Sequence, residues 1–143
     1  MSFVLDNSVS MLWLLPHSNP AGMALAEQVL MQLQTTSATV PSLWLLEGAN
    51  VIAKCQLMGK ITQAQASTFV ALLNDLGIEV DRDTATHALH ATLDLARQYR
   101  LSSYDAAYLE LALRLGVPLA TLDADLAAAA RSAGVPLLDQ MWP

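Results

Sequence analysis

Short apolar runs alternate with longer segments of helical period along this chain, and this alternation constrains the fold more than any other feature. The runs are rich in Val, Leu or Ile and end in an acidic or turn residue. Strands that alternate with helices imply right-handed crossovers and a mainly parallel sheet with helices on both faces. We expect strands at Phe3–Leu5, Thr39–Val40, Ile78–Val80, Leu119–Leu122 and Pro136–Leu138. We expect helices at about residues 8–15, 21–34, 42–57, 62–75, 84–99, 103–115 and 124–132.

Length and composition favour one compact domain spanning residues 1–143. Hydrophobic residues make up 54% of the chain and charged residues 14%, so a sheet buried on both faces or an oligomer interface is expected. No segment reaches the roughly 18–20 apolar residues of a membrane span. The apolar start carries Asp6 and lacks the basic region of a signal peptide. We therefore expect a cytoplasmic protein with no membrane association.

Charge and metal-binding residue types narrow the function classes. The net charge is −6, which counts against broad, non-specific attraction to nucleic acid or anionic membranes. The single cysteine, Cys55, cannot form an internal disulfide and is interpreted as a small buried hydrophobe rather than a nucleophile. His17, His87 and His90 do not form a zinc pattern, and we expect structural or surface roles for them.

Acidic residues follow the expected strands, at the edge of a parallel sheet where functional crevices form. Asp6 follows "FVL", Asp123 and Asp125 follow "PLATL", and Asp105 lies in the first turn of the helix after Ser102. Each has a structural alternative, because Asp6 and Asp123 could be helix N-caps and Ser102-x-x-Asp105 resembles a capping box. Asp125 could equally be a solvated acid, as could Asp139 near the end of the chain.

The stretch "LWLLEGANVI" contains an acid that capping does not explain. Glu47 lies beyond the first helical turn, and its helix shows hardly any polar face before Lys54, the first basic residue of the chain. A buried carboxylate needs a partner, and none is available locally. We therefore hypothesise that Glu47 points into the crevice where Asp6, Asp105 and Asp123 converge.

Four carboxylates in one crevice repel one another and raise one another's pKa, so they are tolerable mainly around a divalent cation. Oxygen ligands alone select hard ions, which favours Mg²⁺ or Mn²⁺ over zinc. Magnesium held by carboxylates usually keeps several waters, one of which can be activated to attack a phosphodiester. The acids therefore indicate phosphoryl chemistry.

Three stretches, "FVLDNSV", "VPSLWLLEGANVI" and "LSSYDAAYLELALRLGVPLATLDADL", occur in this order and spacing over nearly the whole chain. With them the sequence resembles the PIN-domain ribonucleases, in particular the VapC-like toxins of bacterial toxin–antitoxin pairs. The resemblance implies a three-layer α/β/α sandwich around a central, mainly parallel sheet of about five strands. It also implies an acidic metal site that cleaves RNA with Mg²⁺ or Mn²⁺.

The resemblance also assigns site residues and partners. Asp6, Glu47, Asp105 and Asp123 match the family's catalytic and metal-binding acids, and Asp125 is a further candidate ligand. Ser8, Asn50 and Thr121 match the residues that support those acids. Lys54 shares the helix face of Glu47 and is a candidate for contacting the substrate. By resemblance, we expect a homodimer neutralised by an antitoxin whose tail carries a basic residue to the acidic groove.

The sequence also admits functions other than RNA cleavage. The strongest alternative is a catalytically inactive PIN-like module that binds a partner peptide in the acidic groove; Trp13, Leu14 and Trp142 would suit a partner surface, although core packing explains them equally well. A haloacid-dehalogenase-type phosphatase would need a second acid where this chain has Ser8. A receiver domain would need an acidic pair and a late Lys, and a dinucleotide binder would need G-x-G-x-x-G, none of which is present.

Overall fold

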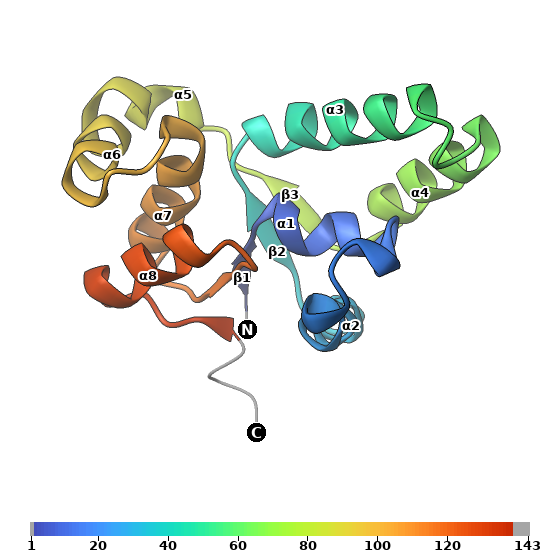
Figure 1. Ribbon diagram of the computed structural model, residues 1–143. Coiled ribbons are helices and arrows are strands. Elements are labelled where there is room, and N and C mark those ends of the chain that lie inside the picture. The colour runs from blue at the N-terminus through green and yellow to red at the C-terminus, as the bar shows by residue number, and fades with distance from the viewer. Residues whose placement is uncertain (1, 139–143) are drawn as a thin grey trace.

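A computed structural model describes residues 2–138 and contains a parallel sheet of four strands in the order β3-β2-β1-β4 (Figure 1). The central strand β1 pairs with β2 in the register Phe3↔Ala38 and with β4 in the register Val4↔Leu119. The edge strand β3 pairs with β2. The strands are β1 (Phe3–Leu5), β2 (Ala38–Val40), β3 (Ile78–Val80) and β4 (Leu119–Ala120).

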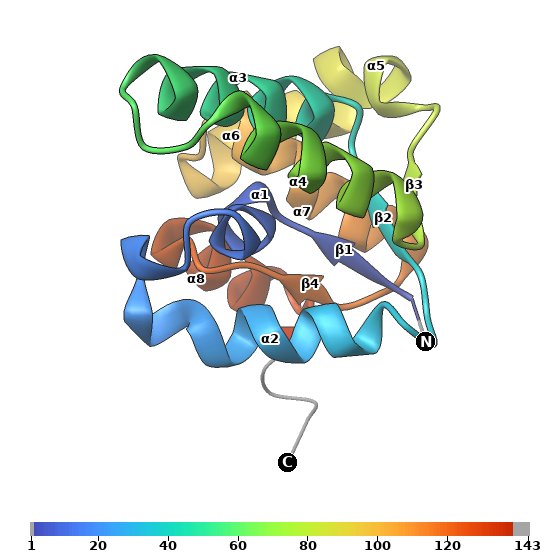
Figure 2. The same cartoon turned by 90° about the vertical axis from the view of Figure 1, so that its right-hand side faces the viewer.

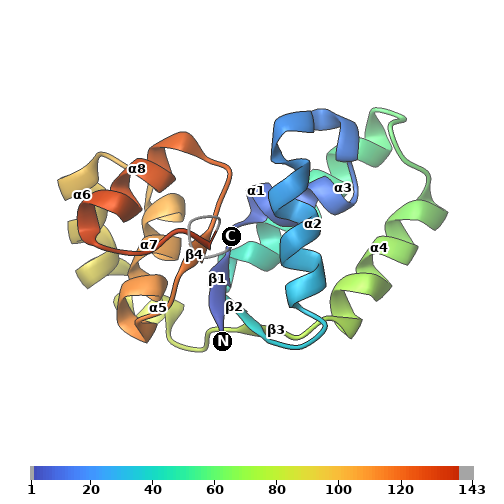
Figure 3. The same ribbon diagram turned by 90° about the horizontal axis from the view of Figure 1, so that it is seen from below.

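Helices cover both faces of the sheet, so the expected three-layer α/β/α fold is confirmed. Figures 1 and 3 place α1 to α4 on one side of the sheet and α5 to α8 on the other. The first side contains α1 (Asn7–Ser10), η1 (Met11–Trp13), η2 (Pro16–Ser18), η3 (Pro20–Gly22), α2 (Met23–Gln32), α3 (Leu43–Leu57) and α4 (Gln63–Asp75). The second contains α5 (Thr84–His87), the π turn η4 (Ala88–Thr92), α6 (Leu93–Tyr99), α7 (Ser103–Leu115) and α8 (Ala124–Ala133).

The core lies where β1 meets α7. All three residues of β1 are buried, and α7 buries a continuous run that includes Tyr108, Leu109 and Leu111. Helices α1 to α4 close the opposite face, which Figure 2 shows from the front. Because all four strands are parallel, the residues that follow them meet at one edge of the sheet.

The expected strands and helices match the structure with four informative differences. The helix expected at 8–15 is the short α1 followed by the 3-10 turn η1. The helix expected at 84–99 is interrupted by η4. The strand expected at Leu119–Leu122 ends at Ala120, because Thr121 turns its hydroxyl toward Asp6 and Asp123 caps α8. The strand expected at Pro136–Leu138 contributes one isolated bridge, between Leu137 and Leu119.

The expectation that α3 has hardly any solvated face before Lys54 is wrong. Leu45 is 52% exposed and Leu46 is 76% exposed, so apolar side chains lie on the outer surface of this helix. Cys55 is buried, as expected. Within residues 2–138, no helix is long and apolar enough to cross a membrane. Asp139 and Trp142 lie outside the described residues.

Candidate active site

Asp6 follows β1 directly and is the most buried acid of the site, with 5% of its surface exposed. Its Oδ2 accepts hydrogen bonds from the hydroxyls of Ser8, at 2.6 Å, and Thr121, at 2.7 Å. Burial raises the pKa of this carboxyl, the two hydroxyls lower it, and the charge of Asp123 raises it further. No Lys, Arg or His of residues 2–138 forms an ion pair with it.

The two hydroxyls also join the ends of β1 and β4. Ser8 Oγ accepts a hydrogen bond from the backbone N–H of Leu122 at 3.0 Å, and Thr121 Oγ1 accepts one from that of Asp123 at 3.0 Å. Each hydroxyl therefore has its donor directed at Asp6 and its lone pairs used by the β4–α8 turn. This arrangement holds the Asp6 side chain in one orientation.

Glu47 reaches the site from the middle of α3, on the opposite face of the sheet from α7. Its Oε1 accepts a 2.5 Å hydrogen bond from the hydroxyl of Tyr108, which is fully buried on α7. Burial raises the pKa of Glu47, the bond from Tyr108 lowers it, and the charges of Asp6 and Asp105 raise it. The same burial and the bond to Glu47 raise the phenol pKa of Tyr108, which keeps this hydroxyl a proton donor.

Asp105 lies one helical turn before Tyr108, in the first turn of α7. Its pKa is raised to about 6, first by burial, then by the charges of Asp123 and Asp6, while the hydrogen bond with Ser102 lowers it. The charges of Asp6 and Asp123, which follow β1 and β4, therefore act on Asp105. This mutual electrostatic influence places the three carboxylates in one neighbourhood.

Asp123 combines two roles that the sequence left open as alternatives. Its Oδ2 accepts a 2.8 Å hydrogen bond from the backbone N–H of Leu126, so it is the N-cap of α8. Its charge also raises the pKa of Asp6 and of Asp105. Asp125 is exposed in the first turn of α8, and its charge contributes to the raised pKa of Asp105.

The remaining site predictions concern side chains on α3. Asn50 is exposed one turn after Glu47 and makes no side-chain hydrogen bond within the described part of the chain. Lys54 is exposed two turns after Glu47 and has no ion-pair partner there. Their supporting and substrate-contacting roles remain predictions. Tyr108 was missed, since nothing in the sequence singles out one aromatic residue of an apolar helix.

The residues present suit a hard divalent cation by chemistry. The donors are carboxylate oxygens from β1, α3, α7 and α8, and no basic side chain of residues 2–138 neutralises them. No three His, Cys, Asp or Glu side chains in this range stand close enough to share one ion. Binding an ion here therefore requires the carboxylates to turn toward one another, which relief of their repulsion would favour.

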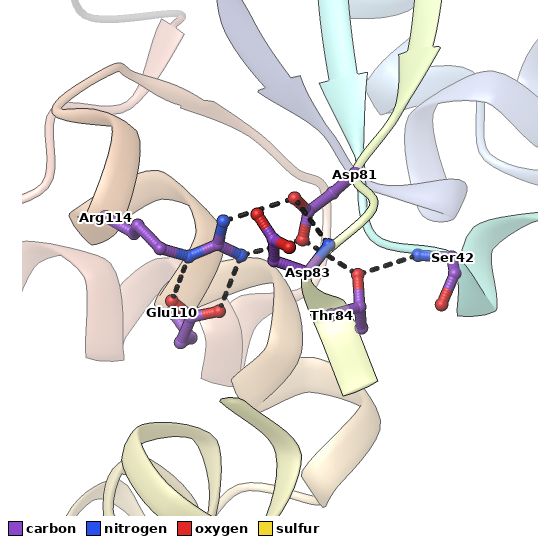
Figure 4. Close-up of polar contacts among 6 residues, drawn as sticks. All are labelled: Ser42, Asp81, Asp83, Thr84, Glu110 and Arg114. Atoms are coloured by element: carbon purple, nitrogen blue, oxygen red, sulfur yellow. Dashed lines mark hydrogen bonds and ion pairs between the residues drawn. The ribbon is translucent and has the colours of Figure 1, made fainter. Parts of the chain in front are cut away.

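A second group of acids, Asp81 after β3 and Glu110 on α7, is neutralised by a cation (Figure 4). Arg114 of α7 donates to both oxygens of Asp81, at 3.1 and 2.7 Å, and to both oxygens of Glu110, at 2.8 and 3.0 Å. Asp81 also accepts a 2.9 Å bond from the hydroxyl of Thr84, which in turn accepts from the backbone N–H of Ser42. This network joins α7 to the starts of α3 and α5.

This chain is similar to known proteins in its sequence and in its fold. A family profile described as PIN domain matches residues 3–132. Among solved structures, PAE2754 from Pyrobaculum aerophilum is similar with a TM-score of 0.68 at 20% identity, covering 99% of this chain and 86% of that one. VapBC2 from Rickettsia felis, bound to a DNA fragment from its promoter, is similar with a TM-score of 0.63 at 13% identity, covering 96% of this chain and 97% of that one.

Such low identities show a shared fold and nothing further, and no curated protein matches the chain as a relative. The profile match is the stronger finding, because it spans both ends of the sheet and all four acids of the site. Proteins with this domain are generally nucleases that use divalent metals. The chain belongs to the PIN-domain family.

Proposed function

We propose that this protein is a Mg²⁺- or Mn²⁺-dependent endoribonuclease that hydrolyses RNA phosphodiester bonds and is the toxin of a toxin–antitoxin pair. The observation that carries the proposal is the buried Asp6, surrounded by the charges of Glu47, Asp105 and Asp123 without an ion-pair partner in residues 2–138. Folding such repelling acids together is unfavourable unless a ligand offsets the repulsion. Membership of the PIN-domain family supports nuclease chemistry at this edge of the sheet.

The proposed site has two sets of residues. Asp6, Glu47, Asp105 and Asp123 would hold the cation, with Asp125 as a further candidate at the exposed side. When bound, the cation supplies an activated water and stabilises the negative charge that develops on the phosphate. Ser8 and Thr121 keep Asp6 oriented, and Tyr108 keeps Glu47 oriented, by the hydrogen bonds described above.

Cleavage of RNA by the purified chain tests this function. Structured RNA incubated with Mg²⁺ or Mn²⁺ should be cut, and EDTA should abolish the cutting. Asp6→Asn and Glu47→Gln should each reduce the rate at least about a hundredfold, because each removes one charged oxygen ligand. Glu79→Gln, the same change at an exposed acid of β3, is the matched control and should cleave normally. Cleavage that persists in EDTA, or in Glu47→Gln, contradicts the proposal.

One observation favours the alternative, an inactive PIN-like module that binds a partner peptide in the acidic groove. The acids of the site are not gathered into ligating positions within residues 2–138. The two functions separate on metal binding, since an inactive module has no need of a cation. No change in melting temperature at millimolar Mn²⁺, together with no cleavage, would favour the module.

A cognate antitoxin and a second copy of the chain are the proposed protein partners. The resemblance of the fold to one that also occurs in VapBC2 supports the first. Exposed apolar side chains on α3, including Leu45 and Leu46, support a protein-covered surface. Light scattering of the chain alone and co-expressed with the product of a short neighbouring reading frame tests both.

A further inference from the structure

A hollow of about 340 Å³ lies between the end of α6 and one face of α8. It is lined by Tyr99 and Arg100 from α6 and its C-cap, and by Asp125, Ala128, Ala129 and Ser132 from α8. Both helices lie on the same face of the sheet (Figures 1 and 3). Asp125, two residues after Asp123, lines one end of the hollow, which extends along about 10 Å of α8 to Ser132.

Arg100 holds an unusual backbone conformation at this place. It is the C-cap of α6 with φ 56° and ψ 43°, in the left-handed region. Within residues 2–138, every other residue of positive φ is a glycine, including Gly116 and Gly134 at the ends of α7 and α8. Glycine or asparagine is the residue that such a cap favours. An arginine here is therefore better explained by its side chain than by the turn.

The guanidinium of Arg100 has no protein partner among residues 2–138. It forms no ion pair or side-chain hydrogen bond within the part of the chain that the structure describes, and it is exposed. Asp125 lines the same hollow without pairing with it. Arg97, on the same helix, at least approaches Asp94 at 3.8 Å. The charge of Arg100 is thus available to a ligand.

We propose that this hollow is a binding subsite for a nucleotide of the single-stranded RNA flanking the cleaved bond, an inference that rests on the proposed function. Arg100 contacts a backbone phosphate, which an arginine fork binds well. The ring of Tyr99 offers an apolar surface to a base, and Ser132 and Asp125 offer polar groups to the base edge or the ribose hydroxyls. The hollow has a volume at the lower end of the range for ligand pockets.

The acidic character of the protein makes a local cation necessary for binding a nucleic-acid strand. The net charge is −6 and the neighbouring site is a group of carboxylates, so a phosphate backbone needs a local cation to approach. Of the seven basic residues, Arg114 is bound to two acids and Lys54 lies on α3, across the sheet. Arg100, which has no ion pair within residues 2–138, lines a hollow together with Asp125, two residues after Asp123.

Binding of a fluorescein-labelled random 12-nucleotide RNA in EDTA, measured by anisotropy over a series of salt concentrations, tests the subsite. Arg100→Asn, which suits the left-handed cap, should weaken binding roughly tenfold and reduce the slope of log K against log salt by about 0.7. Its melting temperature should be equal to or above that of the wild type. Ala128→Phe, which fills the hollow without changing charge, should weaken binding similarly.

Matched controls separate the hollow from general effects of charge and bulk. Arg97→Gln removes an arginine from the same helix outside the hollow, and Ala71→Phe adds the same bulk on α4, across the sheet. Both should bind within about twofold of the wild type. Unchanged RNA affinity in Arg100→Asn and Ala128→Phe, equal effects in the controls, or no RNA binding by the wild type would overturn the subsite.

Cleavage assayed in parallel with Mn²⁺ distinguishes the subsite from the nuclease function. Binding that depends on Arg100, without cleavage by the wild type, supports the subsite and contradicts the enzyme. Cleavage with the same KM in the wild type and Arg100→Asn supports the enzyme and contradicts the subsite. If both hold, Arg100→Asn should raise KM roughly tenfold and leave kcat within about twofold, because Arg100 is not among the proposed ligands of the cation.

Discussion

Two groups of acids lie near the ends of the strands of this protein, and they differ in whether a basic side chain of the protein lies among them. After β3, Arg114 joins Asp81 and Glu110, whose side chains are 8% and 6% exposed. After β1 and β4, Asp6 and its neighbours have hydroxyl partners but no ion pair within residues 2–138. Each group contains a buried carboxylate, so burial alone does not mark a functional acid.

The direction of the pKa separates the two groups. The hydrogen bonds from Arg114 lower the pKa of Asp81, against the smaller raising effect of burial. Burial raises the pKa of Asp6, Glu47 and Asp105, and neighbouring acids add to it. The carboxylates of Asp81 and Glu110 are balanced by Arg114, whereas no Lys, Arg or His of residues 2–138 forms an ion pair with the acids near β1 and β4. The first group should stabilise the fold, and the second should depend on what binds.

Removing the cation from the group of Asp81 and Glu110 should have the largest effect. Arg114→Met keeps most of the side-chain volume but leaves Asp81 and Glu110 buried without a positive charge. We expect a loss of about 3–5 kcal/mol in the free energy of unfolding, measured by urea denaturation at pH 7. The network also joins α7 to the starts of α3 and α5, so the whole transition should shift rather than one segment.

Arg97→Met is the matched control for this change. Arg97 is an exposed arginine whose contact with Asp94 is long, at 3.8 Å, so its loss should be below about 0.5 kcal/mol. Equal losses in the two variants would mean that Arg114 stabilises the fold no more than a surface ion pair, and the comparison between the two groups would fail.

Supplying a cation to the group around Asp6 should have the next largest effect. In the absence of RNA, Mn²⁺ at about a hundred times its dissociation constant should stabilise the protein by about 2.7 kcal/mol. The measurement is the melting temperature over a Mn²⁺ titration, with Ca²⁺-free buffer and EDTA as the reference state. Asp6→Asn should abolish the shift, and Asp81→Asn should retain it on a lower baseline. A shift that survives Asp6→Asn would place the ion elsewhere.

The convergence of the acids could be predicted from the sequence because it depends on topology. Parallel strands place Asp6 and Asp123 at one edge whatever the details of packing, and Asp105 is fixed by a cap that its own sequence encodes. The bounds of β1, β3 and α7 follow similarly from local patterns. The distances between the acids could not be predicted from the sequence, because they depend on how each helix packs against the sheet.

The contacts that the sequence did not reveal join residues far apart in the chain. The hydrogen bond from Tyr108 to Glu47 spans 61 positions and depends on how α3 and α7 approach each other across β1. Glu110 and Arg114 are one helical turn apart and could be paired from the sequence, but Asp81 could not be added to them. The outer face of α3, which includes Leu46, was not expected, because apolar periodicity does not distinguish a core face from a surface that binds another protein.

Loss of the Tyr108 hydroxyl should weaken the group around Asp6 without adding or removing charge. Tyr108→Phe frees Glu47 from its donor, which should weaken Mn²⁺ binding roughly tenfold, or about 1.4 kcal/mol. Because that hydrogen bond lowers the pKa of Glu47, the acidic limb of the pH profile of cleavage should also move to higher pH.

Isothermal titration with Mn²⁺ measures the change in metal affinity. Tyr104→Phe, an exposed tyrosine of the same helix, should change neither this affinity nor the pH profile, and a loss equal to that of Tyr108→Phe would assign the effect to packing.

Neutralising one acid of the group around Asp6 should give the smallest effect, and one opposite in sign to that of Arg114→Met. The pKa of Asp105 is raised in the folded protein to about 6 from 3.8, so the folded state binds more protons and its stability falls as pH rises between these values. In EDTA at pH 7, Asp105→Asn should therefore raise the free energy of unfolding. Solvent screening at this half-exposed carboxyl and the lost interaction with the α7 dipole reduce the expected gain to about 1 kcal/mol. Well below pH 3.8 the gain should vanish, because the carboxyl is then protonated in both states.

Asp81→Asn should instead lower the free energy of unfolding at pH 7, since the lowered pKa of Asp81 gives stability that is present above pH 3.8 and lost as the pH falls. Urea denaturation at several pH values measures both, with the exposed Asp94→Asn as control; destabilisation by Asp105→Asn at pH 7 in EDTA would show that its charge is already compensated and that the two groups of acids do not differ.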